Sequence, residues 1–483
     1  MTAQVIDLPA ERTGRRGTDA VTLLTFYVFL LMVIPSPLVF SPLGGAGGPD
    51  TIFAVLLLFA YLLTLVTPPL ALARGRQPIR VAAVVLTCAV LATYISANRR
   101  TLPSLEGNGA DRGLILMLGW LGVMLVAADG IPSMDRLKVL LRRIVMGATA
   151  ISALAITQFF TGLNAARYIQ IPGLSAQTPF TDLLTRNQLN RPSATALHPL
   201  ELALVLAICL PIAIHRARFA PAEFRTRRWL QAALIGMAVP MTVSRSALIA
   251  IVVASLVIVP TWPKRDRRVA YVVGLVAVAG LFASSPGLLG TFRSLFGEIG
   301  SDSSSASRTG AFSSAVPFIS QHPWLGRGFG TFLPATYFFT DDQYLLALIE
   351  IGFIGLIALV GLFVTAWMTA RNARRISGDP EFRDLAQSFA ACVAVPMAGF
   401  ATLDSLSFPM AAGLTFLVLG CVGALWRLVR TETPAAGGGA PPPGRRAPLP
   451  SPEPTSTAIE ARDTQPIPVV RDAAAPVGAG RVR

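Results

Sequence analysis

The membrane-spanning character of the chain is plainest in residues 343–370, which read QYLLALIEIGFIGLIALVGLFVTAWMTA. Glu350 is the only charged side chain in this stretch of 28 residues. Roughly 17 to 25 apolar residues are enough for a helix to cross the hydrocarbon core of a bilayer. The stretch also lacks the alternation of a barrel strand, and unpaired backbone groups are costly in hydrocarbon. The sequence therefore predicts a transmembrane helix here.

Similar apolar stretches recur from Ala20 to Val429 and predict an all-α, polytopic membrane bundle of about twelve helices. The composition agrees, because 53% of the 483 residues are hydrophobic and 14% are charged. An average soluble domain is roughly 25% charged, which argues against an ordinary soluble enzyme. To within a few residues, the predicted spans are 20–41, 51–73, 80–97, 113–129, 138–160, 197–215, 228–243, 245–262, 268–286, 343–370, 384–403 and 408–429.

The net charge of +15 raises the question of whether the chain binds nucleic acid or lies in a membrane. Basic residues bunch in alternate connections between the predicted spans, so that 25 of the 41 Lys and Arg fall on one side and 10 on the other. By the positive-inside rule, the richer side is cytoplasmic. The pattern predicts a multi-pass membrane protein with both termini cytoplasmic, contacts to membrane lipids and no nucleic-acid partner.

The chain divides into three parts on composition. Residues 1–19 form a cytoplasmic segment before the first apolar run, which we interpret as a retained span because no A-x-A-like cleavage site follows it. Residues 20–430 form the transmembrane domain, and residues 431–483 form a tail with eleven prolines and no periodic apolar pattern. Such a tail cannot bury enough surface to offset its chain entropy, so we expect disorder. A Pro-rich ligand for a partner domain is the alternative.

Two long outer connections, about 161–196 and about 287–342, are the first candidates for a functional site. Outer arginines run against the positive-inside tendency, and an anionic ligand such as phosphate or pyrophosphate would explain them, because guanidinium binds it bidentately. Salt bridges and contacts with lipid headgroups are the alternative. The arginines concerned are Arg167, Arg186 and Arg191 in the first connection and Arg293, Arg308 and Arg327 in the second.

Arg245 stands apart, because the sequence MTVSRSAL at residues 241–248 places it between two apolar spans that we expect to form a tight helical hairpin. A charge at the centre of a membrane costs about 2.5–3.5 kcal/mol, so it is usually functional or paired. Three acidic residues, Glu201, Glu350 and Asp404, could balance an arginine. For Glu201 and Asp404 we favour this structural role.

Asp341 and Asp342 lie shortly before the apolar run from Leu346 to Ala370. A carboxylate there could act as general base toward a hydroxyl, or it could cap the helix N-terminus, as the pattern alone favours. The sequence predicts no metal site or cofactor, because the three histidines lie in separate segments and the four cysteines lie in apolar stretches. No nucleotide-binding loop of the G-x-x-x-x-G-K type and no G-x-S-x-G elbow occurs.

Four motifs between about Arg191 and Gly420 resemble, in order, those of the O-antigen ligase and polymerase superfamily. They are Arg191 followed by small residues and His198-Pro199, the helix start at residues 242–248, Arg308 with the Gly-rich stretch 321–330, and residues 341–355, which include Tyr344 and Glu350. Each piece alone is weak, whereas four in the right order and membrane placement are specific. In the last of these motifs, members of the family have His-Asn at the position where this chain has Asp341-Asp342.

The resemblance implies a metal-independent glycosyltransferase-type ligase or polymerase on the outer face of the cytoplasmic (inner) membrane of a bacterium. Its donor would be a polyprenyl-diphosphate-linked saccharide, and its acceptor a glycan, a lipid or a protein. Arg191, Arg245 and Arg308 would hold the diphosphate leaving group, and Asp341 would take the place of the family's histidine base. The motif residues Arg186, His198, Arg327, Tyr344 and Glu350 would contribute to substrate binding.

Two other classes of function stay open on sequence alone. A transporter or flippase of lipid-linked glycans would also use many spans and buried charges. The long outer connections and the lack of matching broken helices in two halves favour the enzyme. A scaffold that recruits partners through the tail 431–483 is the third class, and deletion of the tail would distinguish it.

Overall fold

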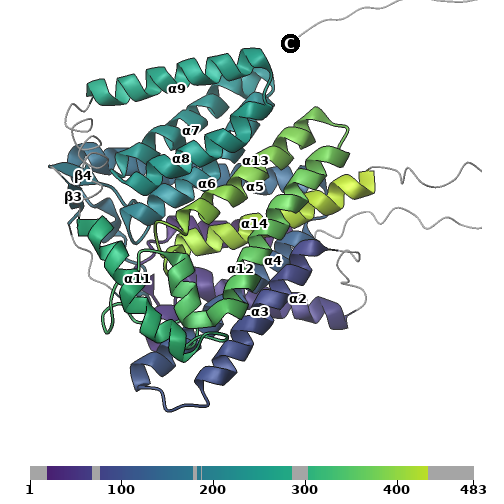
Figure 1. Ribbon diagram of the computed structural model, residues 1–483. Coiled ribbons are helices and arrows are strands. Elements are labelled where there is room, and N and C mark those ends of the chain that lie inside the picture. The colour runs from purple at the N-terminus through teal and green to yellow at the C-terminus, as the bar shows by residue number, and fades with distance from the viewer. Residues whose placement is uncertain (1–18, 68–76, 178–181, 187, 285–302, 433–483) are drawn as a thin grey trace, which may run out of the picture. The chain divides into compact units, whose positions relative to one another are not determined.

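The computed structural model describes residues 19–67, 77–177, 182–186, 188–284 and 303–432, and these are mostly helical, as predicted (Figure 1). The predicted tail and most of the N-terminal segment lie outside the described residues. The α-helices are α1 (Ala20–Val33), α2 (Pro49–Val66), α3 (Pro78–Ala97), α4 (Ser104–Gly130), α5 (Met134–Thr161), α6 (Pro199–Arg218), α7 (Ala222–Met241), α8 (Arg245–Ile258), α9 (Lys264–Ser284), α11 (Ser303–Gln321), α12 (Gln343–Ile376), α13 (Pro380–Gly399) and α14 (Pro409–Glu432).

The remaining elements are short and lie in the connections. The described residues contain two antiparallel pairs of short strands. In one pair β1 (Leu38–Val39) lies beside β2 (Ser175–Ala176), and in the other β3 (Leu184–Arg186) lies beside β4 (Leu189–Arg191). The 3-10 helices are η1 (Ser41–Ala46), η3 (Ala165–Tyr168), η4 (Val259–Thr261) and η5 (Ser405–Ser407).

Seven helices within the described residues are long and apolar enough to cross a membrane: α2, α3, α4, α5, α6, α12 and α14. The apolar α1 and α8 are shorter. Each predicted span overlaps a helix, but α7, α9 and α13 begin with several charged residues. The protein is thus a polytopic helical membrane protein, and the count of twelve stays a prediction. The connection 287–342 contains a helix, α11, which the sequence did not predict.

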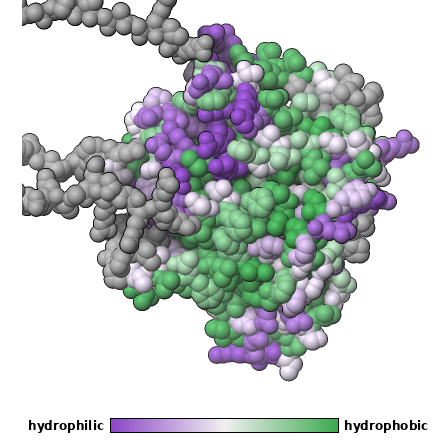
Figure 2. Space-filling model, turned by 180° about the vertical axis from the view of Figure 1, so that it is seen from behind, coloured by the Kyte–Doolittle hydropathy of each residue, from purple (hydrophilic) through white to green (hydrophobic). Residues whose placement is uncertain are grey.

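The core lies among α4, α6 and α14. In the most apolar 18-residue segment of these helices, 72%, 78% and 89% of the residues are buried, whereas in α2 the share is 28%. Many large apolar side chains stay exposed at the periphery, among them Phe59, Leu65 and Ile357. Figure 2 shows a broad hydrophobic surface on one face, with hydrophilic residues gathered toward its margins. A surface of this kind suits contact with lipid rather than water.

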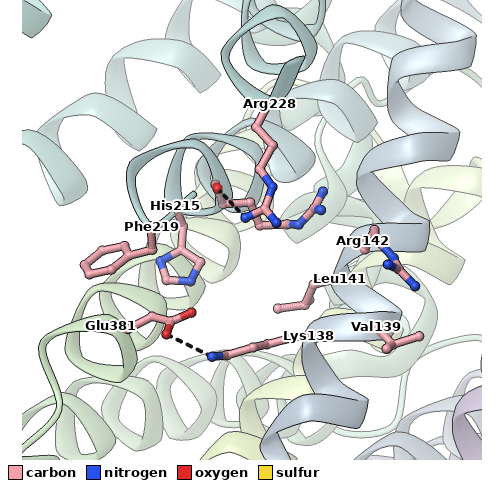
Figure 3. Close-up of a pocket in the computed structure, with 9 residues that line it drawn as sticks. Lys138, Val139, Leu141, Arg142, His215, Phe219, Arg228 and Glu381 are labelled. Carbon is pink, nitrogen blue, oxygen red and sulfur yellow. Dashed lines mark hydrogen bonds and ion pairs between the residues drawn. The ribbon is translucent and has the colours of Figure 1, made fainter. Parts of the chain in front are cut away.

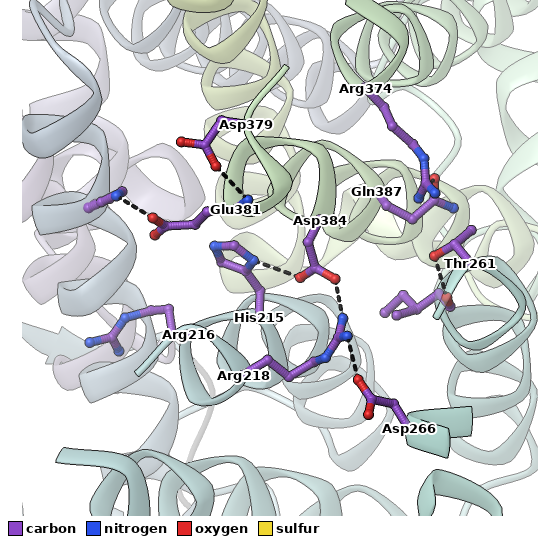
Figure 4. A network of polar contacts seen from close by, with 12 residues as sticks. His215, Arg216, Arg218, Thr261, Asp266, Arg374, Asp379, Glu381, Asp384 and Gln387 are labelled. Carbon is purple, nitrogen blue, oxygen red and sulfur yellow. Dashed lines mark hydrogen bonds and ion pairs between the residues drawn. The ribbon is translucent and has the colours of Figure 1, made fainter. Parts of the chain in front are cut away.

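The basic connections meet at one end of the bundle through polar contacts between helix ends. Asp19 before α1 accepts from Arg136 of α5, and Lys138 of α5 lies 2.8 Å from Glu381 of α13. Asp384 of α13 accepts from His215 and Arg218 at the end of α6 (Figure 4). The starts of α1, α5 and α13 thus lie at the same end of the bundle as the end of α6.

Helix α12 is broken at Gly352, which has φ 63° and ψ −171°. The turn at residues 323–328 fills the break, because the amides of Arg327 and Gly328 donate to the carbonyls of Ile349 and Glu350 at 2.9 Å. The amides of residues 353 and 354 donate in turn to the carbonyls of residues 323 and 324. Backbone groups freed by a helix break must be satisfied inside a membrane protein. The glycine-rich turn therefore completes α12 and fixes the start of this helix.

Candidate functional site

The first part of the candidate site is the β3–β4 hairpin, which carries Arg186 and Arg191. It lies at the end of the bundle opposite the basic connections; the sequence predicts that this end faces outward, and it is called the outer end below. Nε of Arg191 donates to the carbonyl of Thr242 at 3.2 Å, and the Asn190 amide donates to the carbonyl of Phe159 at 3.0 Å. These bonds attach the hairpin to the ends of α7 and α5. Burial, followed by the nearby Arg186, lowers the pKa of Arg191 to about 10. Two cations thus lie close together, as an anion site requires.

Arg245 approaches the same region from the turn between α7 and α8. Residues 242–244 form this turn, so a short connection joins α7 to α8 at the predicted place, and Arg245 is the first residue of α8. Val243 within the turn is fully buried and has φ 50°. A β-branched residue with positive φ is a genuine outlier, because its side chain crowds the backbone. Since Arg191 bonds to Thr242, the two arginines flank one strained turn.

His198 joins the cationic residues from the start of α6. Its Nδ1 accepts from the amide of Leu200 at 3.2 Å, so the imidazole caps the helix, and the ring stacks on Phe408 at 6.0 Å between centroids. Burial, followed by Arg191, lowers the pKa of His198 to about 4. The imidazole is therefore neutral near pH 7, and it connects the arginines with the α13–α14 connection that carries Phe408.

The two aspartates before α12 have separate positions. Asp342 caps the helix, because its Oδ1 accepts from the amides of Tyr344 and Leu345 at 2.8 and 3.0 Å. Asp341 is half-buried, has φ 42° and makes no hydrogen bond or ion pair with any of the described residues. The capping role that the pattern favours thus belongs to Asp342, which leaves the Asp341 carboxylate available for chemistry.

A second carboxylate, Asp404, faces Asp341 from the α13–α14 connection. Burial raises the pKa of Asp404, and the Asp341 carboxylate adds to the rise. Gln343 holds the two segments together, because its amide donates to the carbonyl of Phe400 at 2.7 Å and its Oε1 accepts from the amide of Leu406 at 2.8 Å. The same connection continues to Phe408 and His198, so it joins the acidic and the cationic parts of the site.

Backbone strain gathers on the same segments. Among the described residues, the non-glycine residues with positive φ are Gln188, Ala194, Val243 and Asp341. Gln188 lies in the β3–β4 turn, Ala194 lies between Arg191 and His198, and the other two lie beside or at the predicted catalytic residues. Such conformations cost of order 1–3 kcal/mol each and cluster at functional sites. Their distribution marks this outer region independently of the sequence motifs.

Three of the predicted substrate-binding side chains are engaged within the protein. Arg327 donates to both oxygens of Glu106 at 3.2 Å and to the Tyr337 hydroxyl at 2.7 Å. Glu350 is buried and accepts from the amide of Phe332 at 3.2 Å. These bonds stabilise the glycine-rich turn against α4 and α12, although Nε of Arg327 is buried without a hydrogen-bond partner among the described residues.

The third of these side chains, Tyr344, donates its hydroxyl to the carbonyl of Met397 in α13 at 2.7 Å. Arg308 lies in α11, and its side chain is outside the described residues. The proposed roles of all these residues stay predictions, although the contacts of Arg327, Glu350 and Tyr344 are those of structural residues.

Glu201 differs from the expectation that it balances an arginine. It is fully buried, and its two oxygens accept from the amides of Leu197, Met410 and Ala411 at 2.6–3.2 Å. The carboxylate therefore fastens the first turn of α14 to the start of α6. The sequence offers one signal for this, a carboxylate just after a helix start, but it does not identify the partner helix. Within the described residues, no group of three or more His, Cys, Asp or Glu side chains is arranged to hold a metal ion.

Together, the fold and this outer region define a polytopic helical membrane protein with arginines and a carboxylate pair at one end. Residues 230–360 match the O-antigen ligase family, and the match includes Arg245 and Asp341. The matched segment comprises 131 of the 483 residues, and it supports membership of the O-antigen ligase superfamily, as the motifs predict, and a role in polysaccharide biosynthesis at a membrane. No protein of the curated collection matches the chain. The family supports an activity of the O-antigen ligase or polymerase type, with a glycosyl-transferring enzyme as its class.

Proposed function

We propose that this protein transfers a saccharide from a polyprenyl-diphosphate carrier to an acceptor hydroxyl at the outer face of the cytoplasmic membrane. The observation that carries the proposal is that Arg191 and Arg245 flank one strained turn, while Asp341, which also has positive φ, is linked to them through the α13–α14 connection and His198. The family match supplies the reaction class, a glycosyl transfer, and the sidedness follows from the distribution of basic residues.

The reaction needs one base and one anion site. The acceptor hydroxyl attacks the anomeric carbon of the donor sugar, its proton passes to the Asp341 carboxylate, and the bond from that carbon to the diphosphate oxygen breaks. The leaving diphosphate carries away the bonding electron pair and gains negative charge. Preorganised guanidinium groups stabilise such a charge, and we assign this role to Arg191, Arg245 and Arg308.

The Asp341 carboxylate suits the base because Asp342 performs the capping. A general base contributes about 10²- to 10⁴-fold to a rate. Burial, with a further contribution from the Asp341 carboxylate, raises the pKa of the neighbouring Asp404.

The break in α12 bears on the transporter alternative. Transporters use broken helices whose free backbone groups bind ions or substrate. Here the turn at residues 323–328 satisfies the amides and carbonyls around Gly352. The break therefore supports a rigid site more than an ion-coupled carrier, which favours the enzyme.

The test is glycan transfer in proteoliposomes supplied with polyprenyl-diphosphate saccharides. Arg245→Ala and Arg308→Ala should abolish transfer while the protein still inserts and folds. The matched control is Arg167→Ala, because Arg167 lies in the outer connection that also carries Arg191 but pairs with the exposed Asp182. Normal transfer by both test variants would overturn the diphosphate role. The length of the product distinguishes a ligase, which adds one block, from a polymerase, which adds many.

A further inference from the structure

A cavity lies at the basic end of the bundle, opposite the end that carries Asp341. It has a volume of about 160 Å³ and lies between the starts of α5, α7 and α13 and the end of α6. Its polar lining comprises Lys138, Arg142, His215, Arg216, Arg228 and Glu381 (Figure 3). A cavity of this volume holds several water molecules and therefore has room for a phosphate group.

The cavity has an excess of positive charge. Glu381 is its one carboxylate and is already paired with Lys138 at 2.8 Å. The cations of Arg142, Arg216 and Arg228 therefore face the cavity without an acidic partner among its lining residues. Unbalanced cations of this kind in a partly enclosed site attract an anion.

Arg216 supplies the clearest sign of a missing ligand. Its Nη1 is buried and has no hydrogen-bond partner among the described residues. Its charged neighbours are Arg142, Arg227 and Arg228, all of the same sign. Arg228 donates to the backbone carbonyl of Arg216 at 3.1 Å, which holds the two guanidinium groups in one region. A buried donor without an acceptor costs about 1–3 kcal/mol, and a phosphate oxygen would remove that cost.

The surroundings indicate where such an anion comes from. Lys138, Arg142 and Met146 recur at intervals of four residues and so share one face of α5. Met146, one turn deeper than Arg142, is 40% exposed. A lipid whose phosphate entered the cavity would lay an acyl chain along this apolar side chain. Basic pockets between transmembrane helices bind anionic lipid headgroups in this way.

We propose that this cavity binds a phosphate group, supplied by the headgroup of an anionic phospholipid, and that Arg142, Arg216 and Arg228 hold it. Free phosphate has the same chemistry and is the other source. The site is separate from the candidate transfer site, so it neither requires nor supports the glycan-transfer function. By joining α5, α6, α7 and α13, a bound headgroup should stabilise the folded bundle.

The test uses the full-length protein in detergent, titrated with phosphatidylglycerol, phosphatidylcholine or inorganic phosphate while thermal unfolding is followed. Phosphatidylglycerol should raise the melting temperature, and phosphatidylcholine should do so much less. In Arg216→Gln and in Arg142→Gln, half-saturation should require at least about tenfold more phosphatidylglycerol, which corresponds to about 1.4 kcal/mol. Arg142 is exposed, so its variant should fold even where the other does not.

The matched control is Arg225→Gln, which removes one exposed charge from the same end without touching the cavity. Its half-saturation should equal that of the wild type. Inorganic phosphate that reproduces the shift and competes with the lipid would support the site with a free anion as its occupant. Equal responses to both lipids, or equal losses in the control and the two cavity variants, would overturn the proposal.

Discussion

Substitution of Gly352 by alanine should damage the start of α12 more than its small size suggests. Gly352 has φ 63° and ψ −171°, a region that L residues rarely adopt. An added Cβ would lie 2.5 Å from the backbone carbon and oxygen of Trp324. The glycine-rich turn would have to move away, and with it the four backbone hydrogen bonds that join this turn to both halves of α12.

The expected magnitude follows from these contacts. The backbone conformation alone costs about 1–3 kcal/mol in a residue with a side chain, and each backbone hydrogen bond contributes about 1 kcal/mol net. Loss of two of the four bonds together with the strain gives about 3–5 kcal/mol. At roughly 2 °C per kcal/mol, the melting temperature should fall by about 5–10 °C.

The assay is thermal unfolding followed with a thiol-reactive fluorophore in detergent. It suits this protein because Cys209, Cys392 and Cys421 are buried and become reactive on unfolding. Gly361→Ala is the matched control, because it lies in the same helix and its Cβ would meet no atom within 4 Å. That variant should be as stable as the wild type or slightly more so. Equal melting temperatures for both variants would refute the role given to the turn.

The remaining predictions concern polar contacts at the outer end. Glu201→Ala should cost about 2–4 kcal/mol of stability, because it leaves the buried amide of Met410 without an acceptor; Glu201→Gln should cost less, and equal losses in thermal scans would contradict this. The folded-state pKa of His198, about 4, lies below the unfolded value of about 6.5, so stability should fall as the pH drops from 6.5 toward 4. His198→Asn should flatten that fall, and an unchanged pH profile of the melting temperature would count against it. Glu106→Ala should lower the free energy of unfolding by about 3 kcal/mol, because it leaves the largely buried Arg327 without its carboxylate partner. A loss below about 1 kcal/mol would argue against a structural ion pair.

The sequence predicts the membrane-spanning helices well because hydrophobic length is a local property. Residues 343–370 are recognisable on their own, and each predicted span overlaps a helix of the structure. The sequence did not predict α11, whose Ser-rich stretch SSSASRTG has no apolar period. It also did not predict the break at Gly352, because the residues that complete α12 there come from a turn about 25 residues earlier in the chain.

The site was accessible to sequence reasoning in its parts but not in its connections. The cost of burying charge points to Arg245, whereas Asp341 is indicated by the family resemblance, since the pattern alone favours a cap at the Asp-Asp pair. The division of labour between Asp341 and Asp342 depends on the φ of Asp341 and on cap hydrogen bonds, which the pattern does not encode. The engagement of Arg327 with Glu106 also joins residues 221 positions apart. Such pairs form only through the tertiary fold.

The most direct test of the proposed mechanism compares Asp341→Asn with Asp342→Asn in single-turnover glycan transfer from a polyprenyl-diphosphate saccharide. Asparagine caps helices about as well as aspartate, so Asp342→Asn should keep the fold and most of the rate. Asp341→Asn should lower the rate by at least about 100-fold while donor binding changes by less than about threefold. An unchanged rate in Asp341→Asn, or equal losses in the two variants, would contradict the role of Asp341 as the base.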